Sequence, residues 1–180
     1  DFITANPSIV NVPVKWGDMD AFNHINNTVY FKYFEEGRIR FFRDVQDVVS
    51  ELDPNEECSA SHGFMEGKGG VGPILAHTEC FYKFPATYPD MLVIGAHIDL
   101  QSMTENTILM RYTAWSRMHQ RTVAEGTGKI VAYDYATGKV AEFPQVLVNA
   151  FNEHHVRARE RNLQYKERIS DASNIGETMF

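Results

Sequence analysis

The sequence predicts an α+β domain in which one antiparallel sheet is wrapped around a long central helix. A strand-like segment at 8–16 is followed by an apolar pattern of helical period from position 27. After position 72, strand patterns follow one another with short turns between them, which is typical of antiparallel hairpins. A long helix placed between these segments has to bury its apolar side against the sheet that the strands form.

The period of the apolar residues separates the first strand from the helix. Pro13 lies inside the strand pattern and predicts an edge position, because proline cannot donate a hydrogen bond to a neighbouring strand. In the helix, polar residues form a stripe opposite the main apolar face: Lys32, Glu36 and Arg40. A second apolar flank predicts that the helix is covered on most sides: Phe31, Ile39 and Phe42.

Four more strands are predicted from alternating side chains, at 74–83, 92–101, 107–117 and 121–135. Turns are expected at 85–89 and at Thr137-Gly138-Lys139, and a short helix is expected after Pro144. Residues 1–155 are therefore expected to form one domain, followed by a charged, loosely packed tail at 156–180. An inserted region at 44–72 is expected to continue the helix before Pro54 and then to become a mobile cover or a disordered segment.

Composition excludes several classes of function. The chain has 180 residues, 43% of them hydrophobic, which suffices for one core. Its net charge of -7 argues against a nucleic-acid partner. No run of apolar residues is long enough for a membrane span, and the first residues do not resemble a signal peptide, so we expect a cytoplasmic protein. Cys58 and Cys80 lack the spacing of a metal site and are expected to be reduced thiols.

Several motifs have simpler explanations than chemistry. The segment 67–72 fits a dinucleotide-binding glycine pattern, but a strand follows it where a helix would be needed. The pairs His77 with Glu79 and His97 with Asp99 share strand faces, as polar residues of any half-exposed strand do. On the helix, Glu35 has Arg38 as a neighbour and Glu36 lies in the polar stripe. No metal site and no cofactor is expected.

The segment 16–27 carries the chemistry. It reads Trp-Gly-Asp-Met-Asp-Ala-Phe-Asn-His-Ile-Asn-Asn, and it joins the end of a strand to the start of the helix. The first N–H groups of a helix have no partner within the helix and can stabilise an oxyanion. A carboxylate beside them can attack a polarised carbonyl or activate water, so this arrangement is suited to hydrolysis.

The same segment carries a family resemblance. Trp-Gly-Asp-Met-Asp is followed by His24, Asn26-Asn27 and Tyr30, and then by Tyr33-Phe34-Glu35-Glu36 and Arg38-Ile39. This pattern resembles the signature of the 4-hydroxybenzoyl-CoA thioesterase-like branch of the hot-dog-fold acyl-CoA thioesterases. The resemblance implies a hot-dog fold, a homodimer or tetramer with its active sites between subunits, and hydrolysis of an acyl thioester without a cofactor.

Carried over by position, the resemblance assigns roles to six residues. Asp20 would be the catalytic carboxylate, as nucleophile or as general base, and the backbone N–H of Asn27 would hold the oxyanion. The residues expected to shape the site and contact substrate are Asp18, His24, Asn26 and Tyr30. Many members have glycine where this chain has Asn23, and asparagine tolerates the left-handed backbone that such a turn requires.

Three functions remain open. The first is hydrolysis of an acyl thioester of CoA or of an acyl-carrier protein; the carrier stays open because Met103-Thr104-Glu105-Asn106 stands where some relatives have basic residues for the CoA phosphates. The second is a thioester hydratase or dehydratase on the same fold that pairs Asp20 with His24. The third is an acyl-thioester binding module without turnover.

Overall fold

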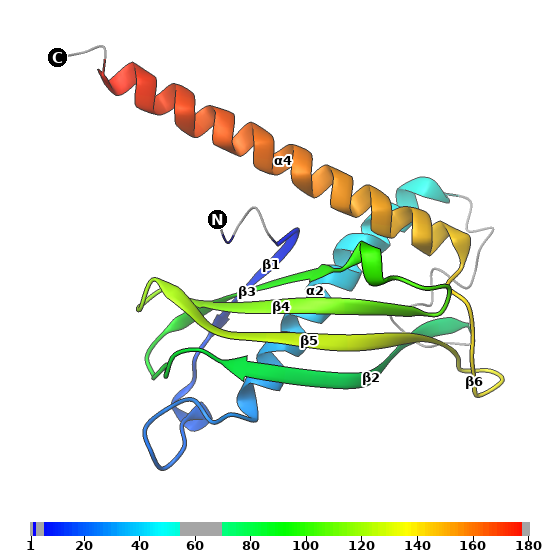
Figure 1. Cartoon of the computed structure of the whole chain (residues 1–180), viewed down its shortest axis with the longest axis horizontal. Helices are drawn as coiled ribbons and strands as arrows, with labels where there is room; N and C mark the ends of the chain where they lie inside the picture. The colour runs from blue at the N-terminus through cyan, green and yellow to red at the C-terminus, as the bar shows by residue number, and fades with distance from the viewer. Residues whose placement is uncertain (1, 3–5, 55–69, 178–180) are drawn as a thin grey trace.

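The computed structural model describes residue 2, residues 6–54 and residues 70–177. Its elements in chain order are β1 (Ser8–Pro13), η1 (Trp16–Asp18), α2 (Val29–Leu52), β2 (Val71–Tyr82), β3 (Met91–Ile98), η2 (Leu100–Ser102), β4 (Thr107–Ser116), β5 (Arg121–Asp134), β6 (Lys139–Val140) and α4 (Gln145–Glu177) (Figure 1). The α+β class is therefore confirmed.

All pairings in the sheet are antiparallel. The strand order is β1-β3-β4-β5-β2, and the short β6 adds to β5. β1 lies at one end of this order, which confirms the edge position predicted from Pro13. β2 lies at the other end, so two strand edges of the described chain are unpaired.

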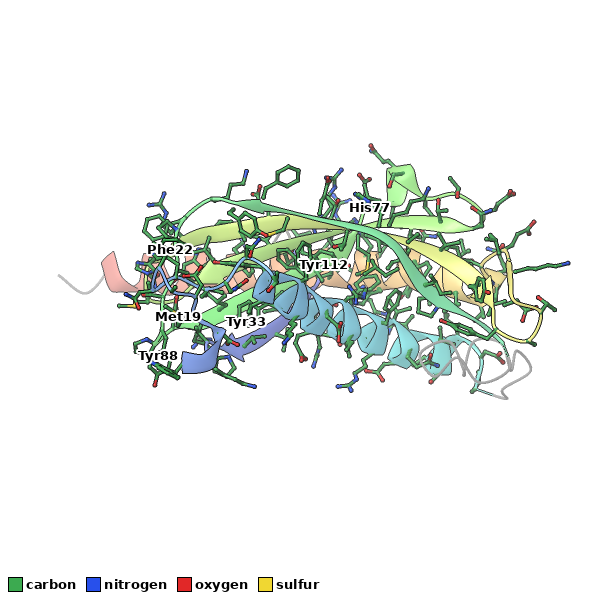
Figure 2. The ribbon with its side chains drawn as sticks, turned by 90° about the horizontal axis from the view of Figure 1, so that it is seen from below. Met19, Phe22, Tyr33, His77, Tyr88 and Tyr112 are labelled. Atoms are coloured by element: carbon green, nitrogen blue, oxygen red, sulfur yellow. The ribbon has the colours of Figure 1, made fainter. Side chains whose placement is uncertain are left out.

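The sheet curls over α2 and packs against one face of it (Figure 2). Phe34 of α2 stacks on Tyr112 of β4 with ring centroids 5.2 Å apart. Gly126 of β5 makes room for this stack, because a Cβ there would lie 2.5 Å from the Phe34 ring. Gly37 likewise lets the helix approach β3, since its Cβ would lie 2.8 Å from Cγ2 of Ile94. These close contacts fix the position of α2 along the sheet.

The C-terminal end of α2 agrees with the sequence prediction, whereas its N-terminal end lies two residues later than predicted. The helix continues to Leu52, as expected for the first part of the 44–72 region. It begins at Val29, so Asn27 lies just outside its first turn. Both the sheet and α4 pack against α2. The predicted second apolar flank is covered, since Phe42 is buried and Phe31 and Ile39 are half-buried, and the polar stripe of Lys32, Glu36 and Arg40 is exposed, as its polar character indicates. Residues 55–69 of the 44–72 region lie outside the described residues, and its last two residues already belong to β2, which begins at Val71 rather than at the predicted position 74.

The last helix is longer than the sequence predicted. In place of a short helix followed by a loose tail, α4 runs without a break for 33 residues (Figure 1). Leu147, Ala150 and Phe151 bury its first turns, and Ala158 is still buried two turns later. Arg157 forms ion pairs with Glu51 of α2 at 2.6 Å and with Glu153 at 2.8 Å. The pair with Glu51 therefore adds a contact with α2 just beyond the apolar pattern that predicted the helix. No helix in the described part of the chain has the length and apolar character needed to cross a bilayer.

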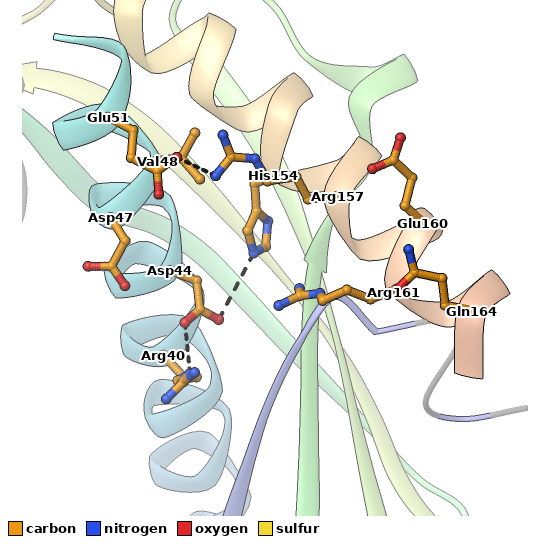
Figure 3. A pocket seen from close by; sticks show the side chains of 10 residues that line it. All are labelled: Arg40, Asp44, Asp47, Val48, Glu51, His154, Arg157, Glu160, Arg161 and Gln164. Carbon is orange, nitrogen blue, oxygen red and sulfur yellow. Dashed lines mark hydrogen bonds and ion pairs between the residues drawn. The ribbon is translucent and has the colours of Figure 1, made fainter. Parts of the chain in front are cut away.

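A buried polar cluster fixes α4 to α2 and β1 (Figure 3). The His154 side chain is only 4% exposed and packs edge-on against Phe41 with ring centroids 5.2 Å apart. Its Nε2 lies 3.3 Å from Oγ of Ser8 and 4.0 Å from Oδ2 of Asp44. Ser8 donates to the same Asp44 oxygen at 2.6 Å, and Arg40 pairs with the other at 2.9 Å.

This cluster predicts that acid weakens the fold. Burial lowers the pKa of His154 from 6.5 to about 4, and the Arg157 and Arg161 charges add to the effect, against the opposing pull of Asp44. Between these two pH values the unfolded chain binds a proton that the folded chain does not. The free energy of unfolding is therefore unaffected by His154 above pH 6.5, where the ring is neutral in both states. As the pH falls from 6.5 to 4, protonation of the unfolded chain lowers this free energy by about 3 kcal/mol. Urea unfolding at a series of pH values measures it.

The control is the next residue along the helix. His154→Gln removes the titrating group and should flatten this part of the pH dependence, whereas His155→Gln should keep it. An unchanged slope in His154→Gln would show that other groups cause the acid sensitivity.

Candidate active site

A tight turn connects η1 to the start of α2 and holds the predicted site residues. Its two arms are paired, because Asn26 N–H donates to the Asp18 carbonyl at 2.9 Å and Asp20 N–H donates to the His24 carbonyl at 2.8 Å. Asn23 lies at the tip with φ +59°, which confirms the left-handed conformation expected of it. The turn is tied to the body of the protein by Ile25 N–H, which donates to the Ala86 carbonyl at 2.9 Å.

The two oxygens of Asp20 have different surroundings. Oδ1 accepts hydrogen bonds from the backbone N–H groups of Phe22 at 2.8 Å and His24 at 3.4 Å. Oδ2 has no hydrogen-bond partner among the residues that the structure describes. Oδ1 therefore holds the carboxylate within the turn, and Oδ2 remains available to contact a substrate or a water molecule.

The peptide that joins Asn26 to Asn27 is oriented by the start of the helix. The Asn26 carbonyl accepts a hydrogen bond from the Val29 N–H at 3.0 Å, so it points into the first turn of α2. In a trans peptide the N–H points opposite to the carbonyl. The Asn27 N–H therefore points out of the N-terminus of α2, where the helix dipole presents positive potential.

The next peptide is fixed at both ends. The Thr28 N–H donates to Oδ1 of Asn26 at 3.0 Å, and the Asn27 carbonyl accepts a hydrogen bond from the Tyr82 hydroxyl at 3.0 Å. Of the four polar groups on the two peptides around Asn27, only its N–H lacks a partner within the described residues. This N–H is a rigid, unoccupied donor.

Asp18 and Asn26 have structural partners. Oδ2 of Asp18 accepts hydrogen bonds from the Tyr33 hydroxyl and the Lys15 N–H, both at 2.8 Å. Burial and the neighbouring Asp18 raise the pKa of Tyr33, so its hydroxyl remains a donor to Asp18. Oδ1 of Asn26 accepts hydrogen bonds from the Thr28 N–H at 3.0 Å and from the Thr28 hydroxyl at 2.8 Å, just before the first turn of α2. Both side chains shape the turn.

Tyr30 and His24 are placed very differently. Tyr30 is buried, with its ring edge-on to Tyr33 at 6.0 Å and to Tyr82 at 5.4 Å. His24 is exposed, and its side chain makes no hydrogen bond within the described part of the chain. The structure does not link its imidazole to Asp20, whose contact with His24 is through the backbone.

An open cavity with both polar and apolar walls lies beside Asp20. A cavity of about 590 Å³ is lined by Trp16, Met19, Asp20 and, from the β2–β3 connection, Thr87 and Tyr88. Figure 2 shows Met19, Phe22 and Tyr88 at the same end of the molecule. Trp16 is 79% exposed and Phe22 82%. Large exposed aromatic side chains of this kind mark a surface that binds a ligand or another chain.

Other reactive groups of the described residues do not form a rival site. Burial raises the pKa of the Cys80 thiol to about 11, so it is not a thiolate at neutral pH. Ser8, His154 and Asp44 include the residue types of a hydrolase triad, but Ser8 donates its proton to Asp44 rather than to the histidine. Glu35 pairs with Arg38 at 3.7 Å, as expected.

Metal binding finds no support in the side-chain clusters. Among the side chains that the structure describes, no three His, Cys, Asp or Glu residues gather in a way that could hold an ion. His97 lies 3.3 Å from Asn6, and Asp99 pairs with Arg111 at 2.8 Å. These contacts explain the histidine of β3 and the aspartate that directly follows this strand.

Tyr82 is the site residue that the sequence did not reveal. It lies in β2, 55 positions from the carbonyl to which it donates, and in the sequence it is one more member of an alternating strand. The lining from Thr87 and Tyr88 was also missed, because only the fold brings the β2–β3 connection beside the turn.

Known proteins share this architecture. A profile of the thioesterase-like superfamily matches residues 14–151. A protein of Aquifex aeolicus (strain VF5) that carries an esterase name is 28% identical over 109 residues, which span 59% of this chain and 70% of that one. A thioesterase of Thermus thermophilus, solved with coenzyme A and zinc, has a TM-score of 0.64 and 21% identity over 83% of this chain and 95% of its own. The DHNA-CoA thioesterase of Staphylococcus aureus has a TM-score of 0.63 and 14% identity over 87% of this chain and 93% of its own.

The match of the superfamily profile covers most of the chain, including the turn, α2 and the strands β2 to β5, and it begins just after β1. The solved structures independently confirm the hot-dog fold that the sequence predicted. The chain therefore belongs to the thioesterase-like superfamily and is by class a thioester hydrolase of the hot-dog fold.

Proposed function

We propose that the chain hydrolyses an acyl thioester with Asp20 as the catalytic carboxylate and the Asn27 N–H as the oxyanion donor. The observation that carries this proposal is the unoccupied Asn27 N–H at the start of α2, on the same tight turn as a carboxylate with one free oxygen. A donor that is already oriented stabilises the developing oxyanion without reorganisation during the reaction.

Two routes use the same groups. In the first, Oδ2 of Asp20 attacks the thioester carbonyl carbon, the oxyanion forms at the Asn27 N–H, and the C–S bond breaks to release a thiolate. Water then hydrolyses the resulting anhydride to the free acid and restores the carboxylate. In the second, Asp20 takes a proton from water, and the water oxygen attacks the carbonyl directly. A thiol with a pKa of about 8.5 leaves as its thiolate without strong acid assistance, so neither route requires a general acid.

Coenzyme A is the thiol carrier that we favour over a carrier protein. The Thermus thermophilus thioesterase of the same fold was solved with coenzyme A. Lys83 pairs with Glu125, whereas the Arg117 side chain donates to the neutral Asn11 and Arg121 stacks on Phe84. Within the described residues neither arginine has an ion-pair partner. Both arginines flank the β4–β5 turn, which hydrogen-bonds Asp90 just after the Tyr88 segment. Their uncompensated charges suit a phosphate group.

A panel of acyl-CoA and acyl-carrier thioesters tests the activity. We expect release of free thiol from at least one member, and the preferred acyl chain follows from the rates. A change of acyl absorbance without thiol release would instead indicate the hydratase or dehydratase that pairs Asp20 with His24. Saturable binding without either signal would indicate a binding module.

Asp20→Asn should abolish most of this turnover and leave the fold intact. The asparagine Oδ1 can still accept from the Phe22 and His24 N–H groups, so the turn is preserved. A neutral amide is neither a nucleophile nor a useful base, and we expect kcat to fall by about 10² to 10⁴-fold. Thiol release at saturating substrate measures the loss, and thermal melting checks the fold.

Asp18→Asn is the matched control two residues earlier. Its oxygen can still accept from Tyr33 and Lys15, so kcat should change far less. An inactive Asp18→Asn beside an active Asp20→Asn would exchange the roles of the two aspartates.

A homodimer or tetramer completes this proposal. β2 has an unpaired edge, and the exposed apolar side chains of the chain include Phe81 and Tyr82 on β2 and Trp16 and Phe22 around the turn. A long, apolar strand edge is an aggregation hazard unless another strand covers it. A second copy related by a two-fold axis covers the same edge on both chains.

Sedimentation velocity should therefore give twice or four times the mass of one chain at micromolar concentration. A lysine placed on the edge, Phe81→Lys, should weaken this association, whereas Val140→Lys, at a similarly exposed position on β6, should not. A folded monomer with full thioesterase activity would contradict the expectation.

A further inference from the structure

We infer that Tyr82 is a positioning residue for the oxyanion site, acting through the backbone of Asn27. This inference rests on the proposed function and deepens it. The Tyr82 hydroxyl donates to the Asn27 carbonyl at 3.0 Å across 55 residues of sequence. It is the one hydrogen bond of the described residues that joins a side chain of the sheet to the peptides on either side of Asn27.

The other anchors of these peptides are local. Asn26 supplies both of them, through its carbonyl to the Val29 N–H and through Oδ1 to the Thr28 N–H. These local hydrogen bonds fix the shape of the helix start, but they do not fix its position relative to the sheet. The Tyr82 bond fixes this shape to β2. The rest of the turn is held by the β2–β3 connection, where the Ala86 carbonyl accepts from the Ile25 N–H.

Packing keeps the Tyr82 ring in place. It lies edge-on to Tyr30 in the first turn of α2, and Tyr30 lies edge-on to Tyr33, which donates to Asp18 on the arm before Asp20. The three rings therefore connect the oxyanion donor to the arm that carries the carboxylate. Edge-on aromatic pairs have preferred geometries, so the chain of rings limits relative motion of the two groups.

Tyr82→Phe tests this role, since it keeps the ring and removes only the hydroxyl. Misplacement of a catalytic group by a fraction of an ångström lowers the rate of the chemical step, so we expect kcat to fall by roughly tenfold or more. KM should stay within about twofold, because the hydroxyl contacts the backbone and not the substrate. The substrate is the best thioester of the panel, assayed on the full chain.

Tyr135→Phe is the matched control. Tyr135 is also about half exposed, and its hydroxyl also donates to a backbone carbonyl of β2, that of Pro73 at 3.2 Å. Pro73 lies at the opposite end of β2 from Tyr82. The control should match Tyr82→Phe in its change of melting temperature and keep the kcat of the wild type.

A double-mutant cycle gives a second measurement. Asn26→Ala removes the bond to the Thr28 N–H, which belongs to the same peptide as the carbonyl that Tyr82 holds. If both side chains fix one peptide, the fold-losses of kcat should not multiply in the double variant. Losses that multiply would show that Tyr82 acts elsewhere.

The outcomes separate the inference from the function on which it rests. A wild-type chain that releases no thiol from any substrate would overturn the proposed hydrolysis. An active wild type with an equally active Tyr82→Phe would overturn the positioning role alone. Failure of Tyr82→Phe to fold, or an equal loss in Tyr135→Phe, would also overturn it, because the hydroxyl would then serve stability.

Discussion

The hydrogen bond from the Val29 N–H to the Asn26 carbonyl is the interaction on which the candidate site depends. It is the first bond of a helix start, and by turning the carbonyl inward it turns the Asn27 N–H outward. The outward-pointing Asn27 N–H therefore results directly from the start of the helix at this point. What the remaining structure has to supply is a carboxylate at the same place and a reason for the helix to begin there.

The hot-dog fold supplies both through packing. α2 cannot slide along the sheet, because Gly37 and Gly126 let it approach so closely that Phe34 and Ile94 fill the space around them. The start of the helix is therefore held at the end of the sheet where the β2–β3 connection passes. There the Ala86 carbonyl accepts from Ile25, which places the turn and its Asp20 beside the first N–H groups. Core packing decides the location of the site, and a few backbone hydrogen bonds decide its geometry.

The sequence predicts the parts of this design that are local. Changes in the spacing of apolar residues located α2 and the strands. Pro13 indicated an edge strand, and Asn23 indicated a left-handed backbone conformation at the tip of the turn. The length of α4 was not predicted, because the apolar pattern that indicates the helix ends near Phe151, whereas the helix continues through a charged segment in which Arg157 pairs with Glu51 of α2. The role of Tyr82 was not predicted for a different reason. Its partner is a backbone carbonyl far along the chain, and no side-chain pattern can encode such a contact.

The burial of His154 illustrates a polar contact that serves the fold alone. Its ring lies between Phe41 and the Ser8 hydroxyl and has lost most of its contact with water, so it stays neutral beside a carboxylate that Arg40 and Ser8 already satisfy. Asp20 is the opposite case, since only one of its oxygens is occupied within the described residues. Both regions contain an aspartate near a histidine: Asp20 and His24 are close in the sequence, and Asp44 and His154 are close in space. The distinction lies in which polar atoms are already paired, and an incompletely paired carboxylate beside an outward N–H is the arrangement that retains capacity for a substrate.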